Sequence, residues 1–173
     1  HAPIRISQND GTLMDCATAL RFPVRMISAG PTNSAVGAAQ RAGLDHCVIA
    51  DIGGTSTDVV VVRGGVPRKS YKNSSIGGIS LNARMPDVVS IALGGGSIVD
   101  DGRIGPTSVA RALKLKSEAF GGSYTTLTDC AIKVGTLTLD GADAARVSIN
   151  SIRAEEYLIT AARSLERAIK TLR

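Results

Sequence analysis

The chain has 173 residues, enough for a buried core, and its 43% hydrophobic and 20% charged residues are typical of a globular protein, which excludes a disordered chain. Its formal net charge of +5 comes from dispersed basic residues, and only two Phe, three Tyr and no Trp could stack on bases, which argues against a nucleic-acid-binding protein. No apolar run reaches the roughly 18 residues that span a bilayer, so no membrane partner is expected.

The N-terminal region is predicted to contain two short strands followed by a helix. The strand candidates are Ile4–Ser7 and Val24–Ser28, and each precedes a turn signal. The helix can be capped at Asn33 or Ser34, and Gly43 would end it.

Three neighbouring strands are predicted next. His46–Ala50 is an apolar run, and Val59–Val62 consists of four β-branched residues, which is typical of a strand buried on both faces. Gly64 and Gly65 predict a tight turn into a third strand that starts near Val66. Short glycine-rich connections favour adjacent places for all three in one sheet.

The following segment is predicted to form a buried strand, a hairpin and a helix. Val88–Leu93 is the strand candidate, and the glycine-rich segment Gly94–Ser97 closes it. Asp101 and Gly102 predict the hairpin turn. Residues 107–116 are expected to be helical.

Two helices are predicted near the C-terminus. The first would be capped by Thr128 or Asp129 and ended by Gly135. The second begins at Asn150, and its apolar side chains recur at helical spacing, at Leu158, Ala162, Leu165, Ile169 and Leu172. Strands in the middle with helices at both ends indicate an α/β or α+β fold.

The cysteines and the first residue bear on the origin of the chain. Cys16, Cys47 and Cys130 are widely spaced, and the two His residues lack ligand spacing, so no zinc site is predicted. We interpret the thiols as buried and reduced in a cytoplasmic protein. The chain does not begin with Met, which suggests a segment of something longer.

The loop Asp51–Asp58, with the sequence D-I-G-G-T-S-T-D, carries the strongest chemical signal. Gly53 and Gly54 lack Cβ atoms, so that backbone N–H groups can approach an anion closely, and the following hydroxyl groups add donors. The terminal aspartates would repel a bare phosphate but can hold Mg²⁺ through its water shell. The loop therefore predicts a Mg-phosphate site. The alternative is a hairpin whose side chains bond their own backbone.

The glycine-rich segment Gly94–Ser97 could approach a ligand in the same way, or form a bulge or hinge. Neither a G-K-[ST] loop nor a G-x-G-x-x-G loop is present, so a P-loop or dinucleotide site is not indicated. No nucleophile lies near a base in the sequence, and the catalytic residues stay unknown.

Several motifs in order resemble the hydantoinase/oxoprolinase family, typified by N-methylhydantoinase A. They are Q-N-D-G-T-L-M at residues 8–14, I-S-A-G-P at 27–31, D-I-G-G-T-S-T-D-V at 51–59, L-G-G-G-S-I at 93–98 and I-G-P at 104–106.

This resemblance implies an α/β, ribonuclease-H-like half of an actin-like ATPase fold, with a mixed sheet and flanking helices. Residues 1–173 would form a single domain, a fragment of the second actin-like half of a larger chain. The implied cofactors are ATP and Mg²⁺, with Asp51 and Asp58 as metal residues. The residues expected to bind the nucleotide are Asp51, Gly53, Gly54, Thr55, Ser56, Thr57, Asp58, Gly94, Gly95, Gly96 and Ser97.

The resemblance also implies an activity. The full-length parent would be an ATP-dependent hydrolase that opens a cyclic amide through a phosphorylated intermediate, and the fragment alone would be inactive. The alternatives are a subunit of an ATP-dependent acetone-type carboxylase and a non-catalytic nucleotide-binding regulatory module. The expected partners are a cyclic amide substrate, the remainder of the chain and a hydantoinase B-type subunit.

Overall fold

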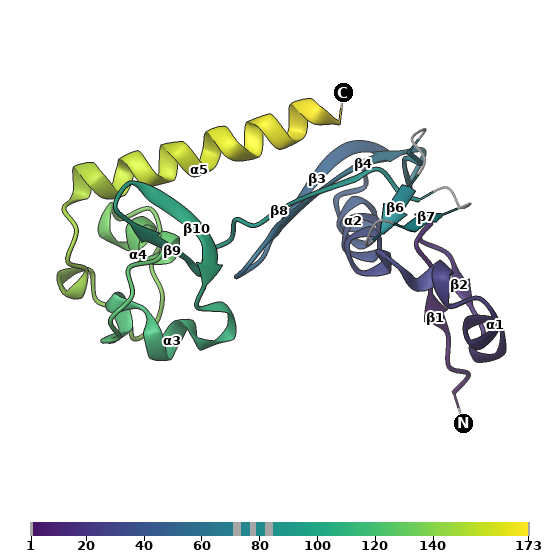
Figure 1. Cartoon of the computed structure of the whole chain (residues 1–173), viewed down its shortest axis with the longest axis horizontal. Helices are drawn as coiled ribbons and strands as arrows, with labels where there is room; N and C mark the ends of the chain where they lie inside the picture. The colour runs from purple at the N-terminus through teal and green to yellow at the C-terminus, as the bar shows by residue number, and fades with distance from the viewer. Residues whose placement is uncertain (1, 71–73, 77–78, 82–84, 173) are drawn as a thin grey trace. The chain divides into compact units, whose positions relative to one another are not determined.

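The computed structural model of the chain describes residues 2–70, 74–76, 79–81 and 85–172 (Figure 1). The fold is α/β, as predicted. It divides into two compact units. Unit 1 comprises His1–Asp51, Asp58–Val89 and Leu172–Arg173, and unit 2 comprises Ile52–Thr57 and Ser90–Thr171. The assignment of residues 1–173 to one domain of a second actin-like half stays a prediction.

Unit 1 is built around a four-stranded sheet in which β3, β4 and β5 follow one another and β8 also pairs with β4. This confirms the predicted neighbourhood of the three strands. The elements up to β8 are β1 (Ile6–Ser7), β2 (Leu13–Met14), α1 (Cys16–Arg21), η1 (Pro23–Met26), α2 (Ala29–Ala42), β3 (His46–Ile52), β4 (Thr57–Arg63), β5 (Val66–Pro67), β6 (Ser74–Ile76), β7 (Ile79–Leu81) and β8 (Val88–Ile91).

Strand β4 is buried on both faces, as its β-branched residues predicted. Val59 and Val60 point to opposite faces, and their exposed fractions are 0% and 1%. On one face, Ala35 and Ala39 of α2 pack against Val60 and its neighbour Val62. The small helix residues let α2 lie close to the sheet, and this contact forms the core of unit 1.

Two predictions in unit 1 need correction. The strand expected at Val24–Ser28 is wrong, because Pro23 begins the 3-10 helix η1 at the position where its fixed φ suits a helical turn. Helix α2 begins at Ala29, before the predicted caps, because Ser28 adopts a left-handed φ of 61° that redirects the chain. The predicted end is confirmed, since Gly43 caps α2 with a φ of 66°.

Unit 2 combines the β9–β10 hairpin with helices α4 and α5, which pack against each other (Figure 1). Val99 of β9 joins residues of both helices in the core, among them Cys130 and Tyr157. The elements from β9 onward are β9 (Ser97–Asp100), β10 (Arg103–Ser108), η2 (Ala110–Ala112), α3 (Leu113–Lys116), η3 (Glu118–Phe120), α4 (Leu127–Lys133), η4 (Ala144–Arg146) and α5 (Ser151–Thr171).

The predicted hairpin and last helix are confirmed in unit 2, but two boundaries differ. Residues 107–116 are only partly helical, because β10 continues to Ser108 and the helical part, η2 followed by α3, begins at Ala110. Helix α4 is capped by Thr126 rather than by Thr128 or Asp129. The side chain of Asp129 instead closes the capping box from the third helical position, where it accepts from the Thr126 N–H at 2.8 Å.

Two of the cysteines differ in their exposure to solvent. Cys130 is buried, and burial raises the pKa of its thiol to about 12, with a further contribution from the charge of Asp129, so the thiol is protonated near neutral pH. Cys16 is exposed, which corrects the expectation that all three thiols are buried.

In the part of the chain that the structure describes, none of the helices has the length and apolarity that crossing a membrane requires.

Candidate functional site

The aspartate-glycine loop is the turn between β3 and β4, and it is shorter than predicted. Strand β3 extends to Ile52 and β4 starts at Thr57, so the loop itself is Gly53–Ser56. The Gly53 N–H donates to the Ser56 carbonyl at 2.9 Å and closes the turn. All four loop residues are exposed.

The second glycine segment lies directly against this loop, within unit 2. The Gly95 N–H donates to the Gly53 carbonyl at 2.9 Å, and the Gly96 N–H donates to the Gly54 carbonyl at 2.7 Å. Two motifs that are far apart in the sequence thus form one backbone-to-backbone contact. The sequence identified both motifs, but not their contact.

Close packing explains the glycines of the second segment. A Cβ atom added at Gly94 would lie 2.6 Å from the Gly53 carbonyl oxygen, and one added at Gly96 would lie 2.8 Å from the Gly54 carbonyl oxygen. The Gly94 N–H donates to the Ser97 Oγ at 2.9 Å. Because the three glycine amides already have acceptors inside unit 2, we interpret the segment as the support of the loop. The assignment of Gly94, Gly95, Gly96 and Ser97 to nucleotide binding stays a prediction.

Three hydroxyl groups complete the support. The Ser108 Oγ donates to the Gly54 carbonyl at 3.0 Å, the Thr57 Oγ1 to the Leu93 carbonyl at 2.6 Å, and the Thr128 Oγ1 to the Gly95 carbonyl at 2.9 Å. No local signal in the sequence indicates the roles of Ser108 and Thr128. Thr57 was predicted as a ligand donor, and in the structure its hydroxyl is buried and donates its proton inside the protein.

The orientation of the loop peptides leaves donors facing outward. The carbonyls of Gly53 and Gly54 point toward the supporting segment. Because the N–H of a trans peptide points opposite to its C=O, the N–H groups of Gly54 and Thr55 point away from it. Within residues 2–70 and 85–172, no hydrogen-bond acceptor faces the N–H groups of Gly54, Thr55 or Ser56. Successive free amides of this kind make a concave anion site.

A family model described as Hydantoinase/oxoprolinase matches residues 1–170. The chain belongs to this family. Among curated proteins, it is 31% identical over 148 residues to caprolactamase subunit alpha of Pseudomonas jessenii, and the match covers 81% of this chain and 21% of that protein. It is 28% identical over 143 residues to the acetophenone carboxylase gamma subunit of Aromatoleum aromaticum, which covers 78% of this chain and 20% of that protein.

Solved structures of ATP-dependent enzymes share the fold. The ATP-dependent caprolactamase from Pseudomonas jessenii matches all of this chain and 29% of its own length, with a TM-score of 0.73 and 25% identity. An ATP-dependent acetone carboxylase without nucleotide matches 98% of this chain and 25% of its own, with a TM-score of 0.59 and 22% identity. The chain therefore spans between a fifth and a third of the length of these relatives.

Family membership does not decide the metal assignment. Asp51 belongs to β3 and is exposed, whereas Asp58 belongs to β4 and is half-buried. Among the residues that the structure describes, no three His, Cys, Asp or Glu side chains gather into a cluster that could hold a metal. A magnesium ion that keeps most of its water shell needs only one or two carboxylates, so Asp51 and Asp58 stay predicted metal residues.

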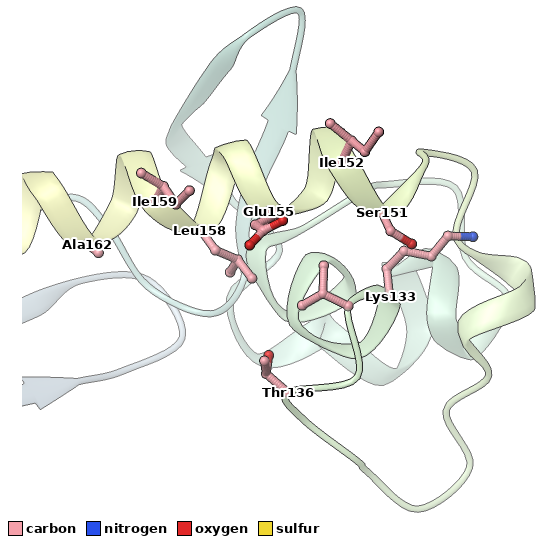
Figure 2. Close-up of a pocket in the computed structure, with 9 residues that line it drawn as sticks. Lys133, Thr136, Ser151, Ile152, Glu155, Leu158, Ile159 and Ala162 are labelled. Atoms are coloured by element: carbon pink, nitrogen blue, oxygen red, sulfur yellow. The ribbon is translucent and has the colours of Figure 1, made fainter.

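A separate surface cavity of unit 2 lies between the end of α4 and the first turns of α5, where Lys133, Thr136 and Glu155 surround apolar side chains of α5 (Figure 2). The Lys133 Nζ donates to the Val147 carbonyl at 2.8 Å. Since this ammonium group has a role in holding the preceding loop, the cavity does not offer a free cation for an anionic ligand, and we place the candidate site at the Gly53–Ser56 loop.

Replacing Thr57 by the isosteric valine is expected to lower the free energy of unfolding by about 1–2 kcal/mol, because the Leu93 carbonyl would lose its donor in a buried environment. Chemical denaturation of the two proteins measures this difference. The matched control is Thr160→Val, whose exposed hydroxyl donates within α5 to the Glu156 carbonyl. Equal stability losses in both variants would contradict the supporting role of Thr57.

Proposed function

We propose that the Gly53–Ser56 loop binds phosphate groups of ATP. The observation that carries this proposal is the pair of Gly54 and Thr55 N–H groups, which point away from the backbone segment that holds their loop. The exposed hydroxyl groups of Thr55 and Ser56 add two donors to the same loop. The ATP dependence stated for the related caprolactamase and acetone carboxylase supports the choice of nucleotide.

We place Mg²⁺ between the phosphates and the aspartates of the flanking strands. The Gly53–Ser56 hydrogen bond closes the turn between β3 and β4, and Asp51 and Asp58 belong to these two strands. Their carboxylates would repel the negatively charged nucleotide unless a cation lay between them, and hydrated Mg²⁺ suits carboxylate oxygens.

The proposed reaction of the whole enzyme is the opening of a cyclic amide. Transfer of the γ-phosphoryl group from ATP to the amide oxygen, with ADP as the leaving group, makes the carbonyl carbon more electrophilic and so favours attack by water. The ring C–N bond then breaks, and inorganic phosphate and the ring-opened amino acid are released. The printed name of the relative with 31% identity, a caprolactamase subunit, supports an amide substrate. This chain would position the phosphates, while the residues that move protons and activate the attacking water would lie elsewhere in the enzyme.

A carboxylase is the second candidate, because an acetophenone carboxylase subunit matches with 28% identity. The same phosphorylation chemistry would activate a ketone instead of an amide. Both curated relatives are named as subunits, which supports a second subunit as a partner. Bicarbonate dependence of ATP turnover by the complete enzyme would favour the carboxylase, and turnover with a lactam alone would favour the hydrolase.

The phosphate role can be tested on the 173-residue chain by titrating inorganic phosphate and Mg-ATP while amide NMR signals are recorded. We expect the signals of Gly54, Thr55 and Ser56 to shift, with a Kd near or above about 1 mM, or about −4 kcal/mol, because exposed charge pairing is screened and binding costs freedom. We expect no ATP hydrolysis by this chain.

The internal control is the supporting segment, whose Gly95 and Gly96 amides already have acceptors and should shift less. Shifts confined to residues outside the Gly53–Ser56 loop would rule out the proposed phosphate site. A micromolar Kd would show instead that the nucleotide site is complete within these residues.

A further inference from the structure

An apolar cavity of about 370 Å³ adjoins the Gly53–Ser56 loop within unit 2. Ile52, which directly precedes the loop, and Thr57, which directly follows it, both line this cavity. Gly94 and Gly95 of the supporting segment form another part of its wall. The cavity and the proposed phosphate loop are therefore neighbours, because the residues on either side of the loop line the cavity.

The far side of the cavity is hydrocarbon. Leu127 and Ala131 of α4 line it together with Ala161 and Leu165 of α5. Ile52 is 62% exposed, so its side chain is accessible to an occupant of the cavity. An occupant with an apolar surface would remove this side chain from water. The free energy of binding would become more favourable in proportion to the apolar area buried.

The polar atoms in the wall are already satisfied. The hydroxyl proton of Thr57 goes to the Leu93 carbonyl, and that of Thr128 goes to the Gly95 carbonyl. The same Gly95 carbonyl also accepts from the Thr128 N–H at 2.9 Å, and the Gly95 N–H is bonded to Gly53. A polar group that entered this cavity would lose its hydrogen bonds to water without finding a free donor, which costs free energy.

We propose that this cavity binds the saturated hydrocarbon part of a small substrate whose phosphorylated end lies at the Gly53–Ser56 loop. The inference rests on the proposed phosphate role of that loop and adds a substrate class to it. A nucleobase is a poorer occupant, because its edge carries several donors and acceptors that the wall does not match. The volume is within the usual range for small-molecule sites and exceeds the roughly 150 Å³ of an engineered cavity that holds benzene.

The experiment compares n-alkyl phosphates with inorganic phosphate on the 173-residue chain, with the Gly54 and Thr55 amide signals as the readout. We expect the affinity to rise about threefold for each added methylene from methyl to butyl phosphate, the dependence expected for burying hydrocarbon. A terminal hydroxyl, as in 4-hydroxybutyl phosphate, should cancel most of this gain. Adenosine monophosphate should bind no better than methyl phosphate.

Variants that fill the cavity provide the second measurement. Ala131→Leu and Ala161→Leu add a side chain to the wall from two different helices, so that one remains informative if the other unfolds. Each should abolish the dependence on chain length and leave inorganic phosphate binding unchanged. Thr136→Leu adds the same side chain in the separate cavity of Figure 2 and should have no effect.

The possible failures are distinguishable. Phosphate binding at the loop without any dependence on chain length would overturn this inference and leave the phosphate site intact. A gain with adenosine monophosphate equal to that with butyl phosphate would assign the cavity to the base and overturn it as well. Failure of every phosphate to shift the loop amides would overturn both this inference and the proposed function.

Discussion

Replacing Gly94 by alanine is expected to lower the free energy of unfolding of unit 2 by about 3 kcal/mol. The added Cβ would lie 2.6 Å from the Gly53 carbonyl oxygen and 2.7 Å from the Gly54 carbonyl carbon and the Thr55 nitrogen. All three are backbone atoms, so the clash cannot be relieved by rotating a side chain, and the two segments must separate. Amide hydrogen exchange in α4, measured against denaturant, reports this loss within unit 2.

The same substitution should reduce phosphate binding, because the loop depends on the segment behind it. We expect the shifts of the Gly54 and Thr55 amides on phosphate addition to be lost. The control is Gly37→Ala in α2, where an added Cβ has no neighbour within 4 Å and should stabilise the helix by about 0.5–1 kcal/mol. A Gly94→Ala protein with unchanged stability would show that the two glycine motifs do not touch.

Replacing Asp129 by alanine is expected to cost about 3 kcal/mol of unfolding free energy, because it leaves buried donors without acceptors. The Asp129 carboxylate is fully buried and accepts from the Ala119 N–H at 2.8 Å, from the Thr126 N–H at 2.8 Å and from the Thr126 hydroxyl at 2.7 Å. It joins η3 to the start of α4, and so holds the helix whose Thr128 supports the second glycine segment.

A matched control separates the effect of burying the carboxylate from the effect of its capping hydrogen bond. Asp143 also accepts from a backbone N–H, that of Ala145 at 2.9 Å, but its side chain is 52% exposed. Water can replace this carboxylate, so Asp143→Ala should cost no more than about 1 kcal/mol. Denaturation curves of the two variants measure the difference, and similar losses would contradict a special role for the buried carboxylate.

Local sequence signals predicted the elements whose causes are themselves local. Four consecutive β-branched residues predicted β4, the Gly64-Gly65 pair predicted the turn into β5, and the spacing of apolar residues predicted α5. The strand predicted at Val24–Ser28 was wrong because its apolar residues suit a 3-10 turn equally well once Pro23 fixes the first φ. Residues 107–116 carried a helical composition, yet part of the segment pairs with β9.

The sequence by itself determined that the chain belongs to the hydantoinase/oxoprolinase family and that the turn after β3 is rich in glycine and hydroxyl residues, because these are properties of the residues alone. Only the tertiary structure decided which of the candidate donors find acceptors within the protein. The Gly94–Gly96 amides and the Thr57 hydroxyl resemble ligand donors in sequence, but folding pairs the Gly94 amide with the Ser97 hydroxyl and the others with carbonyls inside unit 2. A hydrogen-bond donor can bind a ligand only if the fold places no acceptor beside it. Residues as distant in sequence as Gly54 and Ser108 come into contact only through the tertiary structure.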